Sequence, residues 1–248
     1  MPPLDRFSGH AAQYAQFRIG YPPALYDFLL SLTPGRAAAW DCGTGNGQVA
    51  ADLAPHFTRV EATDISPEQL AQVVPQPNVH YRVSPAERTP FAAGSFDLIT
   101  VAQALHWFDA EAFHREARRV ARPGAVVAEW GYGLVKVNEQ IDPLIQHFYT
   151  RIVGPYWDAN RRHIDDEFAC LPFPFSQMQQ CRFAERQSWD AERFLRYLQT
   201  WSSVQRYRRA VGEEPLGQIE PQLRALWGEE KREVCFPIFL RAGSITEQ

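Results

Sequence analysis

The chain has few of the features that mark several large protein classes. Its 248 residues include only 4 cysteines, at positions 42, 170, 181 and 235, and no two of them form a Cys-x-x-Cys pair. This spacing matches neither a zinc signature nor a disulfide framework. We therefore expect no metal site, and reduced thiols in a cytoplasmic protein.

Long hydrophobic runs and a strong excess of one charge are also absent. The sequence has no run of about 18 apolar residues, and residues 1–6 lack the apolar region of a signal peptide. The formal net charge of -4 argues against a nucleic-acid partner. We expect neither a membrane nor a nucleic-acid partner, and the sequence leaves open whether the protein is a monomer or a homodimer.

The chain does contain a glycine-rich turn after a short apolar strand, in the stretch AAAWDCGTGNGQ at 37–48. The strand ends in Asp41, the turn has Gly43, Gly45 and Gly47 at alternate positions, and a helix begins at Gln48. Alternating glycines permit positive φ angles and let a ligand approach the main chain. A carboxylate at the strand end would repel phosphate but attract a ligand with a cationic end.

A second acid, Asp64, ends the strand predicted at 59–64. It follows the glycines by about 20 residues, where a carboxylate can accept both ribose hydroxyls of a nucleoside. Asp64 alone does not distinguish this ligand from NAD, but the dinucleotide pattern Gly-x-Gly-x-x-Gly places its third glycine one position later. Ser66 is predicted to cap the next helix, with Pro67 in the first turn, which would leave Asp64 for the ligand.

Strand and helix signals alternate through the first half of the chain. Further strands are predicted at 79–84, 96–102 and 125–130, and helices at 23–32 and, capped by Asp109, up to residue 120. This alternation predicts a parallel sheet with helices on both faces. Ligands of such sheets bind at the carboxyl ends of the strands, where Asp41 and Asp64 lie.

The second half is richer in aromatic residues and prolines. We expect an insertion over the sheet edge at about 137–178, strands near 180–185 and at 233–241, a helix capped by Asp190, and further helices at 203–211 and at 215–227. The chain is then divided into an N-terminal lid and first helix (1–33), a cofactor-binding core (34–136), a cap insertion (137–178) and the C-terminal part of the core sheet with its helices (179–248).

The pattern Asp-x-Gly-x-Gly-x-Gly resembles motif I of the class I S-adenosylmethionine-dependent methyltransferases. Residues 5–18 with Tyr21-Pro22, residues 91–97 leading into 101–108, and, more weakly, residues 197–204 make the chain similar to the methyltransferase-11 type, and within it to the trans-aconitate methyltransferase-like group. The resemblance implies a Rossmann-like α/β fold with a seven-stranded, mostly parallel sheet and a helical cap after the fifth strand. It also implies S-adenosylmethionine as cofactor and S-adenosylhomocysteine as product.

The resemblance assigns the methionine end of the cofactor to residues from two segments. Asp41 would face the amino group, directly or through a water, while Gly43, Thr44 and Gly45 let the backbone meet the methionine and ribose. The N-terminal segment would act as a lid. Tyr14 and Arg18, one helical turn apart, would then lie near the sulfonium and the methionine carboxylate. Alternatively, these two residues only pack on the domain surface.

The nucleoside end would be bound by Asp64 at the ribose and by Ile65 at the adenine ring. Related enzymes often place an acid after the third strand to bind the adenine amino group, but that position is Pro85 here. We expect the Ala86 amide, with Glu87 nearby, to replace this contact. Gln103, at the end of the fourth strand, is also expected in the cofactor site.

The residues after Gln103 are expected to line the acceptor pocket. Because histidine is the side chain that ordinarily titrates near neutral pH, His106 is a candidate base, but it is equally a candidate for a histidine that shapes the pocket. A carboxylate acceptor is already ionised and needs no base, so His106 would then orient or neutralise it. Trp107 is expected to be a pocket wall. The aromatic insertion suggests a small organic acceptor with carboxylate or aromatic character.

Competing functions stay open from the sequence alone. They are an NAD-dependent oxidoreductase on the same architecture, a cofactor-binding module without transfer activity, and an RNA methyltransferase, although the chain has no basic stripe. The cluster Arg206, Arg208 and Arg209 is better explained as a solvated helix face. His163 lacks metal-ligand spacing and is expected at the surface.

Overall fold

One seven-stranded sheet organises the computed structural model, which describes residues 19–246. Its strand order is β3-β2-β1-β4-β5-β7-β6. The five strands from β3 to β5 in this order are parallel to their neighbours. β7 runs antiparallel to both β5 and β6. This confirms the predicted Rossmann-like α/β fold. The strands are β1 (Ala38–Cys42), β2 (Arg59–Asp64), β3 (Val79–Val83), β4 (Phe96–Ala102), β5 (Ala121–Tyr132), β6 (Ser176–Trp189) and β7 (Arg232–Ser244).

Helices connect these strands, and three of their predicted caps are confirmed. The side chains of Ser66, Asp109 and Asp190 each accept a hydrogen bond from the amide three residues later. The α-helices are α2 (Pro23–Leu32), α3 (Gln48–Leu53), α4 (Pro67–Leu70), α5 (Ala110–Val120), α6 (Asp142–His147), α7 (Arg162–Asp165), α8 (Ala191–Gln199), α9 (Ser202–Val211) and α10 (Glu220–Trp227). No helix among residues 19–246 is long and apolar enough to cross a membrane.

Shorter helical turns complete the chain. They are η1 (Ala54–His56), η2 (Leu105–Trp107), η3 (Phe148–Ile152), η4 (Gly154–Tyr156), η5 (Ala159–Arg161) and η6 (Pro215–Gln218). The prediction of one helix over 215–227 was wrong, because η6 and α10 are separated at Ile219. Pro221 lies in the first turn of α10, where its missing N–H suits a helix start better than a helix interior.

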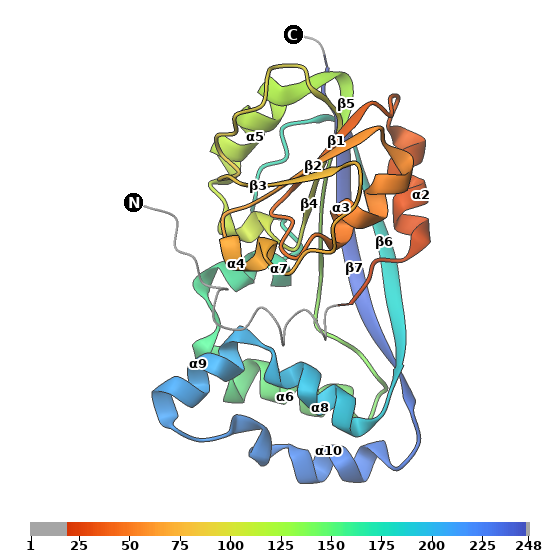
Figure 1. Ribbon diagram of the computed structural model, residues 1–248. Coiled ribbons are helices and arrows are strands. Elements are labelled where there is room, and N and C mark those ends of the chain that lie inside the picture. The colour runs from red at the N-terminus through yellow and green to blue at the C-terminus, as the bar shows by residue number, and fades with distance from the viewer. Residues whose placement is uncertain (1–18, 247–248) are drawn as a thin grey trace.

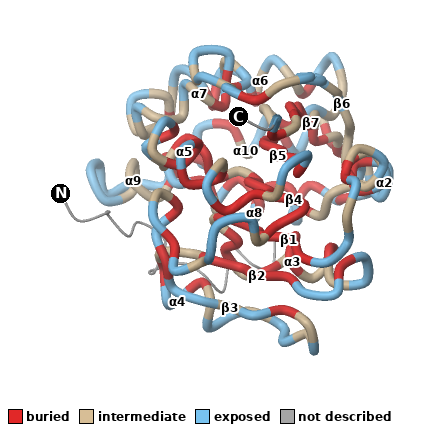
Figure 2. Tube along the Cα trace, turned by 90° about the horizontal axis from the view of Figure 1, so that it is seen from above, coloured by how far each residue is buried: buried red, intermediate tan, exposed pale blue. Residues whose placement is uncertain are grey.

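The centre of the sheet is buried on both faces. On one face Trp40 of β1 packs with Phe113 of α5, and on the other Ala39 packs with Leu25 of α2 and Leu53 of α3. Figure 2 shows buried residues concentrated in β1, β2 and β4, whereas the edge strand β3 is mostly exposed. Successive β1 side chains therefore serve opposite helical layers, as expected for a sheet covered on both sides.

A helical layer made of α6, α8, α9 and α10 gathers beyond one end of the sheet (Figure 1). Its apolar cluster combines Ile145 and Phe148 with Phe194, Leu198 and Leu223. The layer therefore draws on two stretches of sequence, one before β6 and one between β6 and β7. The long strands β6 and β7 extend from the core to this layer (Figure 1).

A buried ionic network joins the core to the end of the 137–178 segment. Glu129 of β5 has no exposed side-chain surface and accepts hydrogen bonds at 2.6 Å from His114 Nε2 and at 2.7 Å from Arg241 Nε. Arg241 also donates to the carbonyls of Phe168, at 3.0 Å, and Leu171, at 2.9 Å. The Arg241 guanidinium therefore holds the segment that leads into β6.

Candidate active site

The glycine-rich turn between β1 and α3 has the backbone that its composition predicts. Gly43, Gly45 and Gly47 have φ angles of +69°, +57° and +83°. A Cβ atom on Gly43 would lie 2.6 Å from Cβ of Ala104, and one on Gly47 would lie 2.8 Å from the ring of Tyr81. The turn is therefore packed between β3 and the segment after β4, and larger residues are excluded from it.

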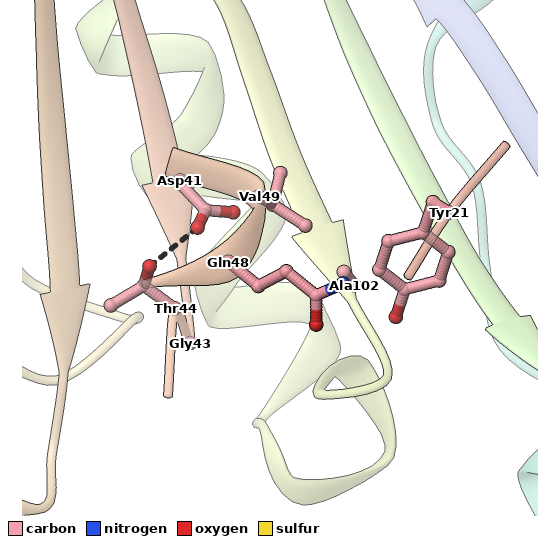
Figure 3. A pocket seen from close by; sticks show the side chains of 7 residues that line it. All are labelled: Tyr21, Asp41, Gly43, Thr44, Gln48, Val49 and Ala102. Atoms are coloured by element: carbon pink, nitrogen blue, oxygen red, sulfur yellow. Dashed lines mark hydrogen bonds between the residues drawn. The ribbon is translucent and has the colours of Figure 1, made fainter. Parts of the chain in front are cut away.

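Asp41 lies at the end of β1 and is only 1% exposed. Its carboxylate accepts a hydrogen bond from Thr44 Oγ1 at 2.5 Å and one from Thr100 Oγ1 at 2.9 Å. These two hydroxyls, from the turn and from β4, fix the orientation of the carboxylate. Figure 3 shows the bond to Thr44 at the wall of a small pocket.

That pocket is formed where the turn, α3, β4 and the segment before α2 meet. Its lining consists of Tyr21, Asp41, Gly43, Thr44, Gln48, Val49 and Ala102 (Figure 3). The Tyr21 ring packs edge-on against Trp130, with centroids 5.5 Å apart, and Gln48 Nε2 donates to the Ile19 carbonyl at 3.0 Å. The segment before α2 is thereby held over the carboxyl ends of the central strands.

Asp64 connects the end of β2 to the glycine-rich turn. Its Oδ2 accepts a hydrogen bond from the Gly45 amide at 2.8 Å, and its Oδ1 accepts one from the Ser66 amide at 2.9 Å. Ser66 caps α4, as predicted, and Asp64 also accepts hydrogen bonds from two backbone amides. The half-buried carboxylate is positioned by both segments that flank it.

The residues expected near adenine lie in different surroundings. Ala86 is buried in the same cluster as Leu105, whereas Ile65 is partly exposed. Glu87 Oε1 accepts a hydrogen bond from the Asp109 amide at 3.0 Å, so this carboxylate is tied to the start of α5. Both Ala86 and Glu87 thus face the segment that follows β4.

Gln103 clamps the ends of β4 and β5. Its φ of +56° is uncommon for a residue other than glycine. Its backbone N–H donates a hydrogen bond to the Trp130 carbonyl at 2.8 Å. Its Oε1 accepts from the Tyr132 amide at 3.2 Å. The side chain is therefore turned toward β5, which supports a positioning role at the strand edge.

His106 and Trp107 are brought together on η2, directly after β4. His106 is 8% exposed, and its buried Nδ1 has no hydrogen-bond partner among residues 19–246. Burial, reinforced by the charges of Arg161 and His163, lowers the pKa of His106 to about 3. An imidazole with this pKa is neutral at physiological pH and weakly basic, which favours shaping or orientation over proton abstraction. The Trp107 ring lies beside it, 4.7 Å away between centroids.

Two residues near His106 were missed or misplaced from sequence. Arg161 was not singled out, and His163 was expected at the surface, but Nδ1 of His163 is buried without a partner in the described chain. Arg161 ends η5 and His163 lies in α7, and these elements are too short for a periodic pattern to indicate which residues are buried. Tyr14 and Arg18 lie outside the described residues.

The arrangement fits a nucleoside ligand with a cationic end. Asp41 and Asp64 end adjacent parallel strands, and the glycine-rich turn lies between them at the same edge. A sulfonium and an amino group suit the buried carboxylate of Asp41, and a ribose suits that of Asp64. Fold and site together define the class I methyltransferase type.

Comparison with known proteins identifies the family. A model described as a methyltransferase domain matches residues 40–128. A Dictyostelium discoideum protein named as a methyltransferase is 31% identical over 245 residues, covering 95% of this chain and 93% of that protein. A methyltransferase of Aspergillus candidus is 31% identical over 178 residues, covering 63% of this chain and 54% of its own.

A solved structure from Anaeromyxobacter dehalogenans, described as a type II methyltransferase, is 41% identical. It superposes with a TM-score of 0.86 and covers 93% of this chain and 99% of its own. The chain belongs to the class I S-adenosylmethionine-dependent methyltransferases. This finding confirms the methyltransferase prediction and rejects the alternative of an NAD-dependent oxidoreductase.

Proposed function

We propose that the protein transfers the methyl group of S-adenosylmethionine to a small organic acceptor with carboxylate or aromatic character. The observation that carries the cofactor assignment is the hydrogen bond between Asp64 and the Gly45 amide. This bond holds the carboxylate that we assign to the ribose directly against a turn that a ligand can approach closely. When bound, S-adenosylmethionine supplies an activated methyl group on a sulfonium, and S-adenosylhomocysteine is the product.

The cofactor would be held along the carboxyl ends of β1 and β2. Asp41 binds the methionine amino group, Thr44 and its flanking glycines meet the methionine and ribose, and Asp64 accepts the ribose hydroxyls. Ile65, Ala86 and Glu87 form the adenine side. Tyr14 and Arg18 would close the site from the N-terminal lid, and Gln103 would hold the ends of β4 and β5 in register beside it.

The acceptor would bind between the cofactor edge and the cap. The cap insertion at 137–178 would choose the acceptor, with 1–33 as lid, 34–136 as core and 179–248 completing the sheet and its helices. His106 and Trp107 end the core side of this pocket. The low basicity of His106 supports a role in orienting an acceptor that reacts without losing a proton. We place the enzyme in the cytoplasm.

Calorimetric titration tests the cofactor assignment. Wild-type protein is titrated with S-adenosylmethionine, S-adenosylhomocysteine, NAD and NADH. We expect micromolar binding of the two sulfur ligands alone, weakened at least tenfold by Asp64→Ala. The control is Asp27→Ala, which removes an exposed acid on α2 and should bind like wild type.

Because Asp64 also holds the Gly45 and Ser66 amides, thermal unfolding of each variant is measured alongside binding. Unchanged affinity in a folded Asp64→Ala protein would contradict the assigned ribose contact. Failure of folded wild-type protein to bind either sulfur ligand would contradict the proposed function itself.

A further inference from the structure

Arg161 is a largely buried cation with unused hydrogen-bond donors. Its side chain is 18% exposed, and its guanidinium carbon lies 4.9 Å from the ring centroid of Trp157 and 5.6 Å from that of Tyr149. Nε donates to Tyr149 Oη at 2.8 Å and lies 3.7 Å from Asp165 Oδ1. Neither terminal nitrogen donates to any residue among 19–246. Because the described residues leave these donors unpaired, a ligand with acceptor oxygens would pair them.

Two histidines converge on the same place. His106 and His163 each have a buried Nδ1 without a partner in the described chain. Both Arg161 and His163 are near enough to His106 to affect its charge state, and η5, which ends at Arg161, packs against η2, which carries His106. The only carboxylate paired with Arg161 among residues 19–246 is Asp165, which is 49% exposed and also accepts from Tyr149 Oη at 2.6 Å.

This group of nitrogen-bearing side chains lies beside the cofactor edge. η2 follows β4, and Ala104 and Phe108, which flank η2, are the residues that a side chain on Gly43 would strike. The neighbouring walls are aromatic, since Trp107 packs on His106 and Trp157 packs on Tyr149, with centroids 4.7 Å and 5.1 Å apart. A ligand bound here would therefore meet one cation, neutral imidazole and aromatic surface.

We infer that Arg161 is a specificity-determining residue whose terminal nitrogens bind a carboxylate of the methyl acceptor. The planar guanidinium matches a carboxylate through two parallel hydrogen bonds, and a single guanidinium that already lies beside Asp165 suits a singly charged acid better than a phosphate dianion. His106 contributes a hydrogen bond, and the aromatic walls hold the apolar remainder of the acid. This inference rests on the proposed function, because it assumes an acceptor bound beside the cofactor.

The test compares acids with their neutral amides. Phenylacetate, cinnamate and indole-3-acetate, each paired with its amide, and phenyl phosphate are titrated calorimetrically into protein saturated with S-adenosylhomocysteine. We expect at least one acid to bind at least tenfold more tightly than its amide. Arg161→Gln should abolish this preference, Arg161→Lys should reduce it, and Arg162→Gln, which changes the exposed neighbouring arginine, should preserve it.

Several results would overturn the inference. They are equal binding of acids and amides, no binding of any acid, tighter binding of phenyl phosphate, or an acid preference that survives Arg161→Gln. Titration of each variant with S-adenosylhomocysteine and its thermal unfolding report whether the cofactor site and fold are intact. If Arg161→Gln does not fold, the acid-to-amide ratios of wild type and Arg161→Lys decide. Failure of folded wild-type protein to bind S-adenosylhomocysteine would instead contradict the proposed function.

Discussion

The carboxylate of Asp64 lies 2.8 Å from the amide of Gly45, so the end of β2 holds the turn that follows β1. The acid and the glycine are 19 residues apart in sequence and form one structural unit. The same carboxylate holds the Ser66 amide at the start of α4. With the ribose contact proposed for Asp64, variants of this residue would report on both ligand binding and the order of the turn.

Gly43→Ala should impair both stability and cofactor binding. The alanine would take a φ of +69°, and its Cβ would lie 2.6 Å from Cβ of Ala104, a short side chain that cannot swing away. We expect a loss of about 1–3 kcal/mol in the free energy of unfolding, measured by urea denaturation. Gly217→Ala is the control, because nothing lies within 4 Å of its added Cβ. Equal stability of the two variants would contradict the packing of the turn.

Glu129→Gln should strongly destabilise the fold. It removes the charge that pairs with Arg241 and His114 at a site without solvent access. Leaving the Arg241 cation buried without its carboxylate should cost about 3–5 kcal/mol in urea denaturation. The control Glu233→Gln breaks the pair with Arg186, whose side chains are 62% and 57% exposed, and should cost less than about 1 kcal/mol. Similar losses in the free energy of unfolding of the two variants would show that burial does not make the Glu129 ion pair more important for stability than an exposed pair.

Glu116 should make stability depend on acidic pH. Burial alone would raise its pKa, but hydrogen bonds from Arg119 and Thr89 outweigh this effect and lower the pKa from 4.5 to about 2. A carboxyl with a depressed folded-state pKa stabilises the fold above its unfolded pKa, and this stabilisation is lost as pH falls toward 2. The stability difference between wild type and Glu116→Gln should shrink by on the order of 3 kcal/mol between pH 6 and pH 2.

Urea denaturation across that pH range measures the Glu116 effect. Glu111→Gln, an exposed change on the same helix, serves as the control, and its difference from wild type should stay nearly constant. A constant difference for Glu116→Gln as well would mean that its hydrogen bonds do not favour the charged carboxylate.

His106 should stay neutral throughout the physiological range. Burial, followed by the charges of Arg161 and His163, lowers its pKa to about 3, far below the usual 6.5. In an NMR titration the imidazole C–H signals of His106, assigned by their loss in His106→Gln, should not move between pH 5 and pH 8. A midpoint near 6.5 would contradict the buried environment and would restore His106 as a candidate base.

Local signals explain why the central strands and the glycine-rich turn were predictable. The buried strands β1, β2 and β4 read as short apolar runs, and glycine is the residue that tolerates the positive φ of the turn. The caps at Ser66, Asp109 and Asp190 are also local, because each side chain bonds an amide three residues away. These elements follow from neighbouring residues with little help from the rest of the chain.

The surroundings of His106 were not predictable in the same way. Arg161 and His163 lie on turns of three and four residues, which are too short for a hydrophobic period to indicate a buried face. Their neighbour His106 lies more than 50 residues earlier in the chain. The helical layer likewise brings Ile145 and Leu223 into one apolar cluster, which no local pattern encodes.

The place of β7 between β5 and β6 also sets an order of assembly. β6 is made before β7 but pairs with no other strand in the described chain, so its backbone has no partner until residues 232–244 have been synthesised. The helices α8, α9 and α10 lie in the connection between these two strands. Pairing of β7 with both β5 and β6 is therefore required to complete this side of the sheet.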